Sequence, residues 1–296
     1  MKEFAIITDS CSDLDKKLRT EYDVDYVPMH FSLNGVDYDA SLDWEKISVK
    51  DFYDAMRNGT RIYTAQVNSA QYREKFESIL NEGKDVLYIG CSSALSASVI
   101  ASYGVRDELK AKYPDSKIIC IDSLISCAGL GMLVCIASKL RKEDKIIIEV
   151  AEFIENIKLN VHQEAAADKL IYLKQAGRVS ATSAFFGGLL NVKPIIISDA
   201  KGQNFAVEKV KGRKNSIARL AERVVEQYTG EAFDEIVVAH ADCESEAIDL
   251  KSEIIARKSE LESKISIGYI GPIVGASVGP GMMGVYFIGT KVTENA

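Results

Sequence analysis

The first half of the chain alternates short apolar runs with longer segments that have helical periodicity. The clearest apolar runs are residues 4–8, 86–90 and 117–122, and each is short enough to be a buried strand. Alternation of this kind builds a mainly parallel sheet with helices on both faces, so the sequence predicts an α/β fold for this half. The predicted helices cover residues 49–58, 70–82, 95–112, 127–142 and 144–160.

A hairpin is predicted between the first apolar run and the first of these helices. Residues 26–31 form a predicted strand, and Asn34-Gly35 follows them, a dipeptide typical of a type I′ turn. Residues 36–38 are then expected to return as the second strand.

The second half of the chain has a different pattern, in which two strands follow each other directly. Residues 194–198 and 205–210 are separated only by a turn at Lys201-Gly202, which indicates an α+β domain. The other predicted elements are helices at 168–176, 181–190, 215–228 and 244–258, and strands at 235–239, 265–269 and 285–288.

The chain length of 296 residues exceeds the size at which one hydrophobic core usually keeps growing. We therefore predict two domains, an N-terminal α/β domain of residues 1–162 and a C-terminal α+β domain of residues 163–296. No linker rich in proline or serine marks the boundary, so the two domains are expected to pack tightly.

One long segment without charge could be mistaken for a membrane span. Residues 265–290 contain no charged side chain, but they include seven glycines and two prolines, with Gly279-Pro280-Gly281 near the middle. A lipid-exposed helix does not tolerate such a backbone. We predict short buried strands joined by a glycine-rich loop, and no membrane span.

Composition excludes several classes of protein. Hydrophobic residues make up 47% of the chain and charged residues 27%, as in ordinary globular proteins, and the net charge of −7 argues against nucleic acid as a partner. The six cysteines form no C-x-x-C pair and only three histidines are present, so no metal or cofactor is predicted. The lack of a secretory signal favours a reduced, cytoplasmic protein.

Three of the predicted strands end in hydroxyl or carboxyl side chains. The first runs into Asp9-Ser10, the second into Ser93, and the third into Asp122-Ser123. Carboxyl ends of parallel strands meet at one edge of a sheet, where helix N-termini also favour an anion, so these residues predict an anion or carboxyl crevice. The alternative is that the serines only cap helices, while Asp9 braces the crevice and Asp13 lies in a first helical turn.

The same residues could instead belong to the active site of an enzyme. A small-molecule phosphotransferase or hydrolase would use Asp9, Ser93 and Asp122 in the same crevice. Gly90 to Ala94 is similar to a nucleophile elbow but ends in alanine, and His240 is the one downstream histidine that could face a cleft. No Walker A or dinucleotide-binding sequence is present. A scaffold without any ligand is the third possibility.

The segment Gly177-Arg178-Val179-Ser180 predicts an exposed arginine between two helices. A helix is expected to end at Gly177, and Ser180 is expected to cap the next helix. Arg178 would then stand exposed between two helix ends, where a guanidinium can meet a phosphate or a carboxylate in bidentate fashion.

Taken together, the motifs of this chain resemble the DegV family from one end of the sequence to the other. No single motif is decisive, but their order and spacing are. They are Ile7-Thr8-Asp9-Ser10, Ser12-Asp13-Leu14, Thr64-Ala65-Gln66, Ser92-Ser93-Ala94-Leu95-Ser96, Asp122-Ser123, Leu173-Lys174, Gly177-Arg178-Val179-Ser180, Leu189-Leu190-Asn191-Val192-Lys193-Pro194-Ile195 and Gly279-Pro280-Gly281.

The resemblance implies a two-domain protein that holds one long-chain fatty acid in a tunnel between the domains. The carboxylate would meet hydroxyls of Thr64 and of Ser93 or Ser96. Such proteins are the fatty acid-binding, non-catalytic subunit of bacterial fatty acid kinase, and a separate ATP-binding kinase makes acyl phosphate for phospholipid synthesis. Arg178 corresponds to the arginine implicated in contact with that kinase.

The sequence departs from the family pattern at three places. Ala65 and Val67-Asn68 replace the serine and the Pro-Ser of T-S-Q-P-S, and Ala94 and Ala97 replace two glycines. Ser277 stands where the family has a histidine before G-P-G, which makes it a fourth candidate for contact with the carboxylate.

Overall fold

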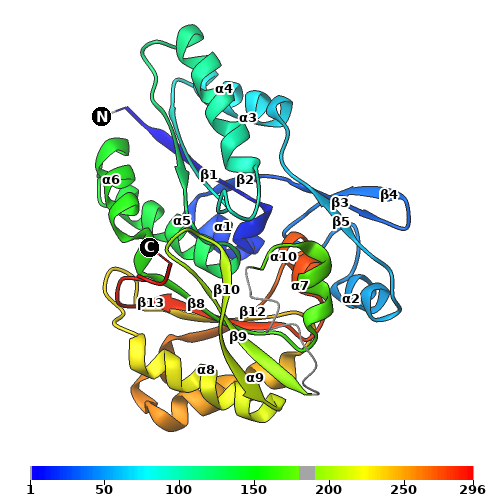
Figure 1. Cartoon of the computed structure of the whole chain (residues 1–296). Coiled ribbons are helices and arrows are strands. Elements are labelled where there is room, and N and C mark those ends of the chain that lie inside the picture. The colour runs from blue at the N-terminus through cyan, green and yellow to red at the C-terminus, as the bar shows by residue number, and fades with distance from the viewer. Residues whose placement is uncertain (1, 180–190, 296) are drawn as a thin grey trace.

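The computed structural model describes residues 2–179 and 191–295. The chain forms two lobes, each built on its own sheet, with a small third sheet beside them (Figure 1). The α/β class with a mainly parallel N-terminal sheet is therefore confirmed. The boundary at residue 162 stays a proposal.

Sheet A is the centre of the N-terminal lobe. Its strand order is β2-β1-β6-β7 and every neighbouring pair is parallel. Helices cover both faces, with α3 and α4 packed together on one side and α5 and α6 on the other (Figure 1). The bounds are β1 Phe4–Asp9, β2 Asp25–Val27, β6 Asp85–Gly90, β7 Ile118–Asp122, α1 Lys16–Tyr22, α3 Ser69–Asn81, α4 Ser98–Lys112, α5 Cys127–Lys142 and α6 Ile147–Ile157.

Sheet B is a three-stranded antiparallel sheet with the order β4-β3-β5. The turn between β3 and β4 has Asn34 and Gly35 at φ of 53° and 79°, so the predicted type I′ hairpin is confirmed. The predicted strand at 26–31 is wrong as one unit, because Pro28 cannot donate to a ladder and the chain changes sheets there. The bounds are β3 His30–Leu33, β4 Val36–Asp39, β5 Tyr63–Ala65 and α2 Val49–Arg57.

Sheet C forms the C-terminal lobe in the order β10-β9-β8-β13-β11-β12. Its pairs are antiparallel except for β11 with β12. Helices α8 and α9 cover one face with a separate apolar core. The bounds are β8 Val161–Ala166, β9 Val192–Ser198, β10 Asn204–Lys211, β11 Ile236–His240, β12 Ile265–Tyr269, β13 Met283–Ile288, α8 Arg213–Gln227 and α9 Glu244–Arg257.

Helix α5 lies between sheets A and C and packs on both (Figure 1). Its residues from Gly129 to Ser138 are all buried, so the helix has no polar face along that stretch. A helix that is apolar on all sides needs apolar neighbours on all sides, and the two sheets supply them. The larger core of the protein accordingly runs from sheet A through α5 to one face of sheet C.

The uncharged segment 265–290 holds β12, a short helix α10 and β13. The predicted glycine-rich loop is thus partly wrong, because Pro272–Val278 is helical with proline at its first turn. No helix in the described ranges is long and apolar enough to cross a membrane. Helix α7, Leu170–Ala176, ends at Gly177 with φ of 67°, as predicted. The helix predicted at 181–190 and its cap Ser180 lie outside the described residues.

Candidate ligand-binding site

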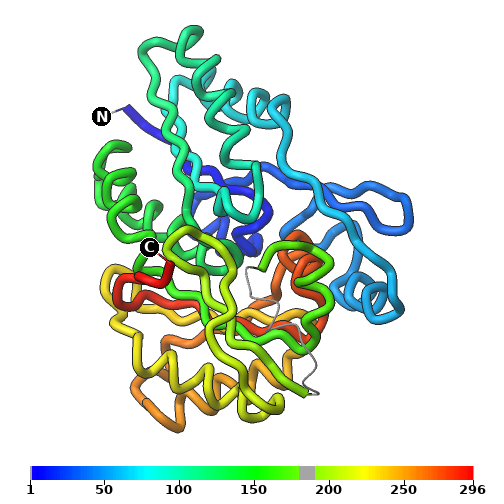
Figure 2. Tube along the Cα trace, in the orientation of Figure 1, coloured from blue at the N-terminus to red at the C-terminus, as the bar shows by residue number. Residues whose placement is uncertain are grey.

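A cavity of about 430 Å³ lies where the carboxyl end of sheet A meets sheet B and α10. We call it the main cavity. Figure 2 shows that segments distant in sequence meet here, since α10 packs beside α7 and against β3 and β5. The described residues that line it are Cys11, Met29, Thr64, Gln66, Cys91, Ser93, Ala94, Leu95, Ser96, Ala97, Ser126, Arg178, Asn204, Ile273, Val274, Ser277 and Val278.

All four predicted carboxylate ligands line this one cavity. Thr64 comes from β5, Ser93 and Ser96 from the loop after β6, and Ser277 from α10. Among the described residues, no side-chain or backbone group is hydrogen-bonded to the hydroxyls of Thr64, Ser93 or Ser277. The Ser96 hydroxyl lies 3.0 Å from that of Ser98. Three or four hydroxyls are therefore free to meet a ligand.

The lining carries no carboxylate among the described residues, and Arg178 is its one charged side chain. An acidic ligand would meet no like charge there. The thiol of Cys11 is also neutral, because its hydrogen bond with the Cys91 thiol and its burial raise its pKa well above the ordinary value. The cavity is thus suited to an uncharged body with an anionic end.

Asp9 and Ser10 do not line the main cavity, although the sequence placed both in the crevice. The Asp9 carboxylate is fully buried and accepts hydrogen bonds from the amides of Cys11 and Cys91, both at 2.9 Å, and from the Tyr88 hydroxyl at 2.8 Å. Burial nevertheless raises its pKa. Ser10 donates to the carbonyl of Ala40 and accepts from another amide. The hydrogen bonds of both residues fix the backbone at the end of β1.

Asp122 and Ser123 play the same kind of part at the end of β7. One Asp122 oxygen accepts from the amides of Ser93 and Leu124, each at 3.1 Å, so it fixes the loop that carries Ser93. The Ser123 hydroxyl donates to the carbonyl of Ile125 at 2.9 Å. Neither residue lines the main cavity. The predicted crevice coincides with the sheet edge at which the main cavity lies, but these side chains shape that edge and do not face the cavity.

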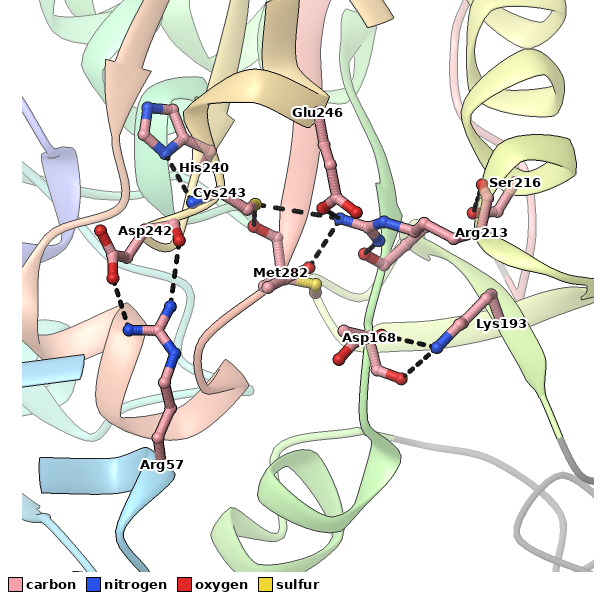
Figure 3. Close-up of polar contacts among 12 residues, drawn as sticks. Arg57, Asp168, Lys193, Arg213, Ser216, His240, Asp242, Cys243, Glu246 and Met282 are labelled. Carbon is pink, nitrogen blue, oxygen red and sulfur yellow. Dashed lines mark hydrogen bonds and ion pairs between the residues drawn. The ribbon is translucent and has the colours of Figure 1, made fainter. Parts of the chain in front are cut away.

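His240 lies in a polar network away from the main cavity, at the end of β11 (Figure 3). It is buried, its Nδ1 is 3.3 Å from the amide of Cys243, and its ring contacts Tyr269. Burial lowers its pKa, so it is neutral. No histidine, aspartate or glutamate among the described residues lines this cavity or is hydrogen-bonded to the Ser93 hydroxyl, which leaves a hydrolase without a general base there.

Arg178, which the sequence predicts to be exposed between two helix ends, lies on the lining of the main cavity. Its side chain is exposed and donates to the carbonyl of Ala176, and no described carboxylate pairs with it. It also lines an adjoining recess together with Thr64 and Ser277. Arg178 thus stands at the junction of two hollows and can reach a ligand in either.

Sequence reasoning missed much of the apolar lining. Ile273, Val274 and Val278 come from α10, which was not predicted as a helix, and Asn204 comes from the start of β10. The spacing of these three apolar residues around Pro272 was the signal available for a helix. A smaller space behind them continues toward Tyr286 of sheet C.

A larger hollow of about 960 Å³ lies at the opposite ends of the sheet A strands. It is lined by charges of both signs, including Lys2 and Asp25, and much of its lining is already paired, as Arg19 is with Asp43. It holds none of the predicted site residues. Volume alone therefore does not select it as a site for an apolar ligand.

The buried carboxylate of Asp13 lies against Gly271, the residue that precedes α10. Asp13 ends a short 3₁₀ turn with φ of 51°, and does not lie in a first helical turn as predicted. Neither carboxylate oxygen has a hydrogen-bond partner of good geometry among the described residues. Burial raises the pKa of Asp13 to about 7, against a smaller opposing effect of the Cys127 thiol and the Gly271 amide.

Asp13→Asn is expected to remove a pH dependence of stability. The folded protein binds the Asp13 proton between its ordinary pKa of 3.8 and about 7, so the free energy of unfolding falls as pH rises through that window, by at most about 1.4 kcal/mol per unit. Asparagine tolerates this backbone conformation. The variant should be more stable than wild type at pH 8 by about 1 kcal/mol or more, and little changed at pH 4, in urea unfolding.

Asp23→Asn is the matched control for this experiment. Asp23 also has a left-handed backbone, with φ of 49°, but its side chain is 86% exposed. Its replacement should change stability by less than about 0.5 kcal/mol at either pH. Equal pH profiles of Asp13→Asn and wild type would show that Asp13 is ionised in the folded protein.

Comparisons with known proteins agree with the fold and extend over nearly the whole chain. The DegV family model, described as "Uncharacterised protein, DegV family", matches residues 3–290. A DegV domain-containing protein of Clostridium perfringens is 35% identical over 289 residues, 98% of each chain. A structure titled "Fatty Acid Binding of a DegV family Protein from Thermus thermophilus" has a TM-score of 0.84 and 25% identity, and covers 98% of this chain and all of that one.

A second solved structure, of a fatty acid binding DegV protein from Bacillus subtilis, has a TM-score of 0.82 at 24% identity, over 98% of this chain and all of the other. Both solved structures share the two-lobed α/β fold of this chain. This chain belongs to the DegV family.

Proposed function

We propose that the main cavity binds one long-chain fatty acid, with its carboxylate among the hydroxyls of Thr64, Ser93, Ser96 and Ser277. The observation that carries this proposal is that four residues from three separate motifs line a single cavity with no acidic side chain among its described lining. The fatty acid bound by the Thermus thermophilus relative supports the same ligand class.

The acyl chain accounts for most of the binding energy. Burying about 15 methylenes contributes on the order of 12 kcal/mol before the cost of association, at about 0.8 kcal/mol each. From the hydroxyl end, the chain would run past Ile273 and Val274 into the space between α10 and sheet C, toward Tyr286. That direction places the carboxylate nearest to Thr64, Ser277 and Arg178.

The protein then acts as a presenting subunit and not as an enzyme in isolation. A buried carboxylate needs several hydrogen bonds, and hydroxyls supply them without a covalent step. A separate ATP-binding kinase subunit would supply the chemistry in the cytoplasm: a carboxylate oxygen attacks the γ-phosphorus of ATP, the bond to the β-phosphate oxygen breaks, and ADP leaves. Arg178 at the cavity mouth would contact that kinase, and the acyl phosphate would serve phospholipid synthesis.

Mass spectrometry of the organic extract of the purified protein tests the ligand. A stoichiometric acid of 14 to 18 carbons supports the proposal. A protein that carries no lipid and takes up none when offered hexadecanoate contradicts it. The phosphotransferase or hydrolase alternative, with Asp9, Ser93 and Asp122, predicts turnover of a small substrate without lipid.

Thr64→Val is expected to weaken fatty acid binding by roughly 10-fold to 100-fold. Valine keeps the shape of the side chain but removes the hydroxyl, and one hydrogen bond to a charged group contributes about 1.5–3 kcal/mol. The measurement is a calorimetric titration of the delipidated protein with hexadecanoate. Thr60→Val is the control, because Thr60 lines only the adjoining recess. Unchanged affinity in Thr64→Val would remove Thr64 from the site.

A further inference from the structure

A second hollow of about 360 Å³ opens beside the main cavity. It lies between the end of α2, the segment 59–64, α7 and α10. Two hydrogen bonds cross from one wall to the other, from Arg61 to the carbonyl of Gln175 at 3.1 Å and from the Tyr172 hydroxyl to the carbonyl of Met56 at 3.3 Å. We call this hollow the cationic recess.

Every charged side chain that lines the recess among the described residues is positive. They are Arg57, Arg61, Lys169 and Arg178. Arg57 is neutralised, since it pairs with Asp54 and also with Asp242 (Figure 3). The other three pair with no described carboxylate. Three uncompensated cations around one concavity favour a ligand with more than one negative charge.

The recess and the main cavity share part of their lining. Thr64, Arg178 and Ser277 face both hollows. In the proposed function the fatty acid carboxylate lies at these residues. A group attached to that carboxylate would therefore enter the cationic recess without movement of the acyl chain.

We propose that the cationic recess binds a phosphoryl group carried on the fatty acid, that is, the head of the acyl phosphate product. This inference rests on the proposed fatty acid site. Transfer of a phosphoryl group turns a head with one negative charge into one with nearly two, with additional acceptor oxygens. Arg61 and Arg178 offer planar guanidinium donors that match such oxygens, and Lys169 adds a point charge. The protein would hold its product more tightly than its substrate.

The test compares two ligands of equal acyl length on the delipidated full-length protein. One is hexadecanoate, and the other is the ketophosphonate analogue of hexadecanoyl phosphate, in which a methylene replaces the bridging oxygen. Calorimetry is carried out on wild type, Arg61→Gln and Lys169→Gln, and on Lys174→Gln as control. Lys174 is exposed on the same helix as Tyr172 but does not line the recess.

We expect wild type to bind the ketophosphonate at least 5-fold more tightly than hexadecanoate. Arg61→Gln and Lys169→Gln should each lower ketophosphonate affinity at least 3-fold and change hexadecanoate affinity less than 2-fold, while Lys174→Gln changes neither. Millimolar inorganic phosphate should compete with the ketophosphonate and not with hexadecanoate, and added salt of equal ionic strength should compete less.

Four results would overturn the inference. The first is ketophosphonate affinity that both recess variants leave unchanged. The second is ATP binding to this protein alone that depends on Arg61 and Lys169, since it would assign the recess to a nucleotide. The third is failure to bind hexadecanoate at all, which would also overturn the proposed function. Hexadecanoate binding with no preference for the ketophosphonate would overturn the recess alone.

Discussion

Arg178→Ala is expected to lower acyl phosphate formation with a cognate kinase and ATP by at least about 100-fold, the usual cost of removing a positioned donor at a reacting oxyanion. Fatty acid binding should survive. The Arg178 side chain is exposed at the cavity mouth, where an ion pair is worth at most about 1 kcal/mol, so affinity for hexadecanoate should fall less than about 5-fold. Arg178→Ala would thus lose transfer to the kinase while it keeps fatty acid binding.

The measurement is acyl phosphate production over a range of kinase concentrations, with lipid loading followed in parallel. Arg178→Lys should restore activity only in part, because an ammonium group cannot reproduce a bidentate contact. Lys174→Ala is the control for loss of an exposed cation nearby. Normal phosphorylation by Arg178→Ala would end the proposed handover role. Loss of lipid in step with activity would instead make Arg178 a carboxylate ligand.

Gly279→Ala is expected to destabilise the protein by about 3 kcal/mol or more. Gly279 follows α10 with φ of 76° and ψ of 169°, a backbone conformation that is essentially limited to glycine and costs other residues about 1–3 kcal/mol. A Cβ there would also overlap the ring of Tyr172 on α7, so the helix beside the cavity would have to move. Urea unfolding measures the loss, and hexadecanoate titration shows whether the displaced α7 also weakens the site.

Two variants separate backbone strain from overlap. Gly83 also has a positive φ, of 81°, and open space where a Cβ would lie, so Gly83→Ala carries positive-φ strain without any overlap. In Gly279→Ala combined with Tyr172→Ala, the overlap is gone, and the double-mutant cycle should show a favourable coupling of at least about 1 kcal/mol. Equal losses in Gly279→Ala and Gly83→Ala would show that Tyr172 adjusts at no cost.

Strands β1, β6 and β7 of sheet A could be predicted because they are largely buried on both faces. Their apolar runs at 86–90 and 117–122 differ from the observed bounds by only one residue at one end. Strands β5 and β8 of the other two sheets were not predicted. Strand β8 contains His162, Gln163 and Glu164, all buried, and Glu164 is compensated by Arg223, 59 residues away. A local pattern does not reveal such a distant partner.

Part of the candidate site could be predicted from the order of strands along the chain. Hydroxyl residues after strand ends meet at one sheet edge, which is a consequence of topology, so Ser93 was found from the strand it follows. Which neighbour faces the cavity depends on loop shape. Asp9 turns inward to three donors, while Cys11 and Met29 take the lining. Thr64 and Ser277 were identified only through the family resemblance, because β5 and α10 have weak local patterns.

The position of α5 between the two sheets has a consequence for how a fatty acid enters. On that side the lobes share one continuous core, and separating them there would expose its apolar residues on both faces. On the side of β5, α7 and α10, the crossing contacts include single hydrogen bonds such as that from Tyr53 to the carbonyl of Ile270. Local opening is cheaper where few apolar contacts are lost. In the proposed function we therefore expect the lipid to exchange through local opening on the side of β5 and α7, while α5 stays in place.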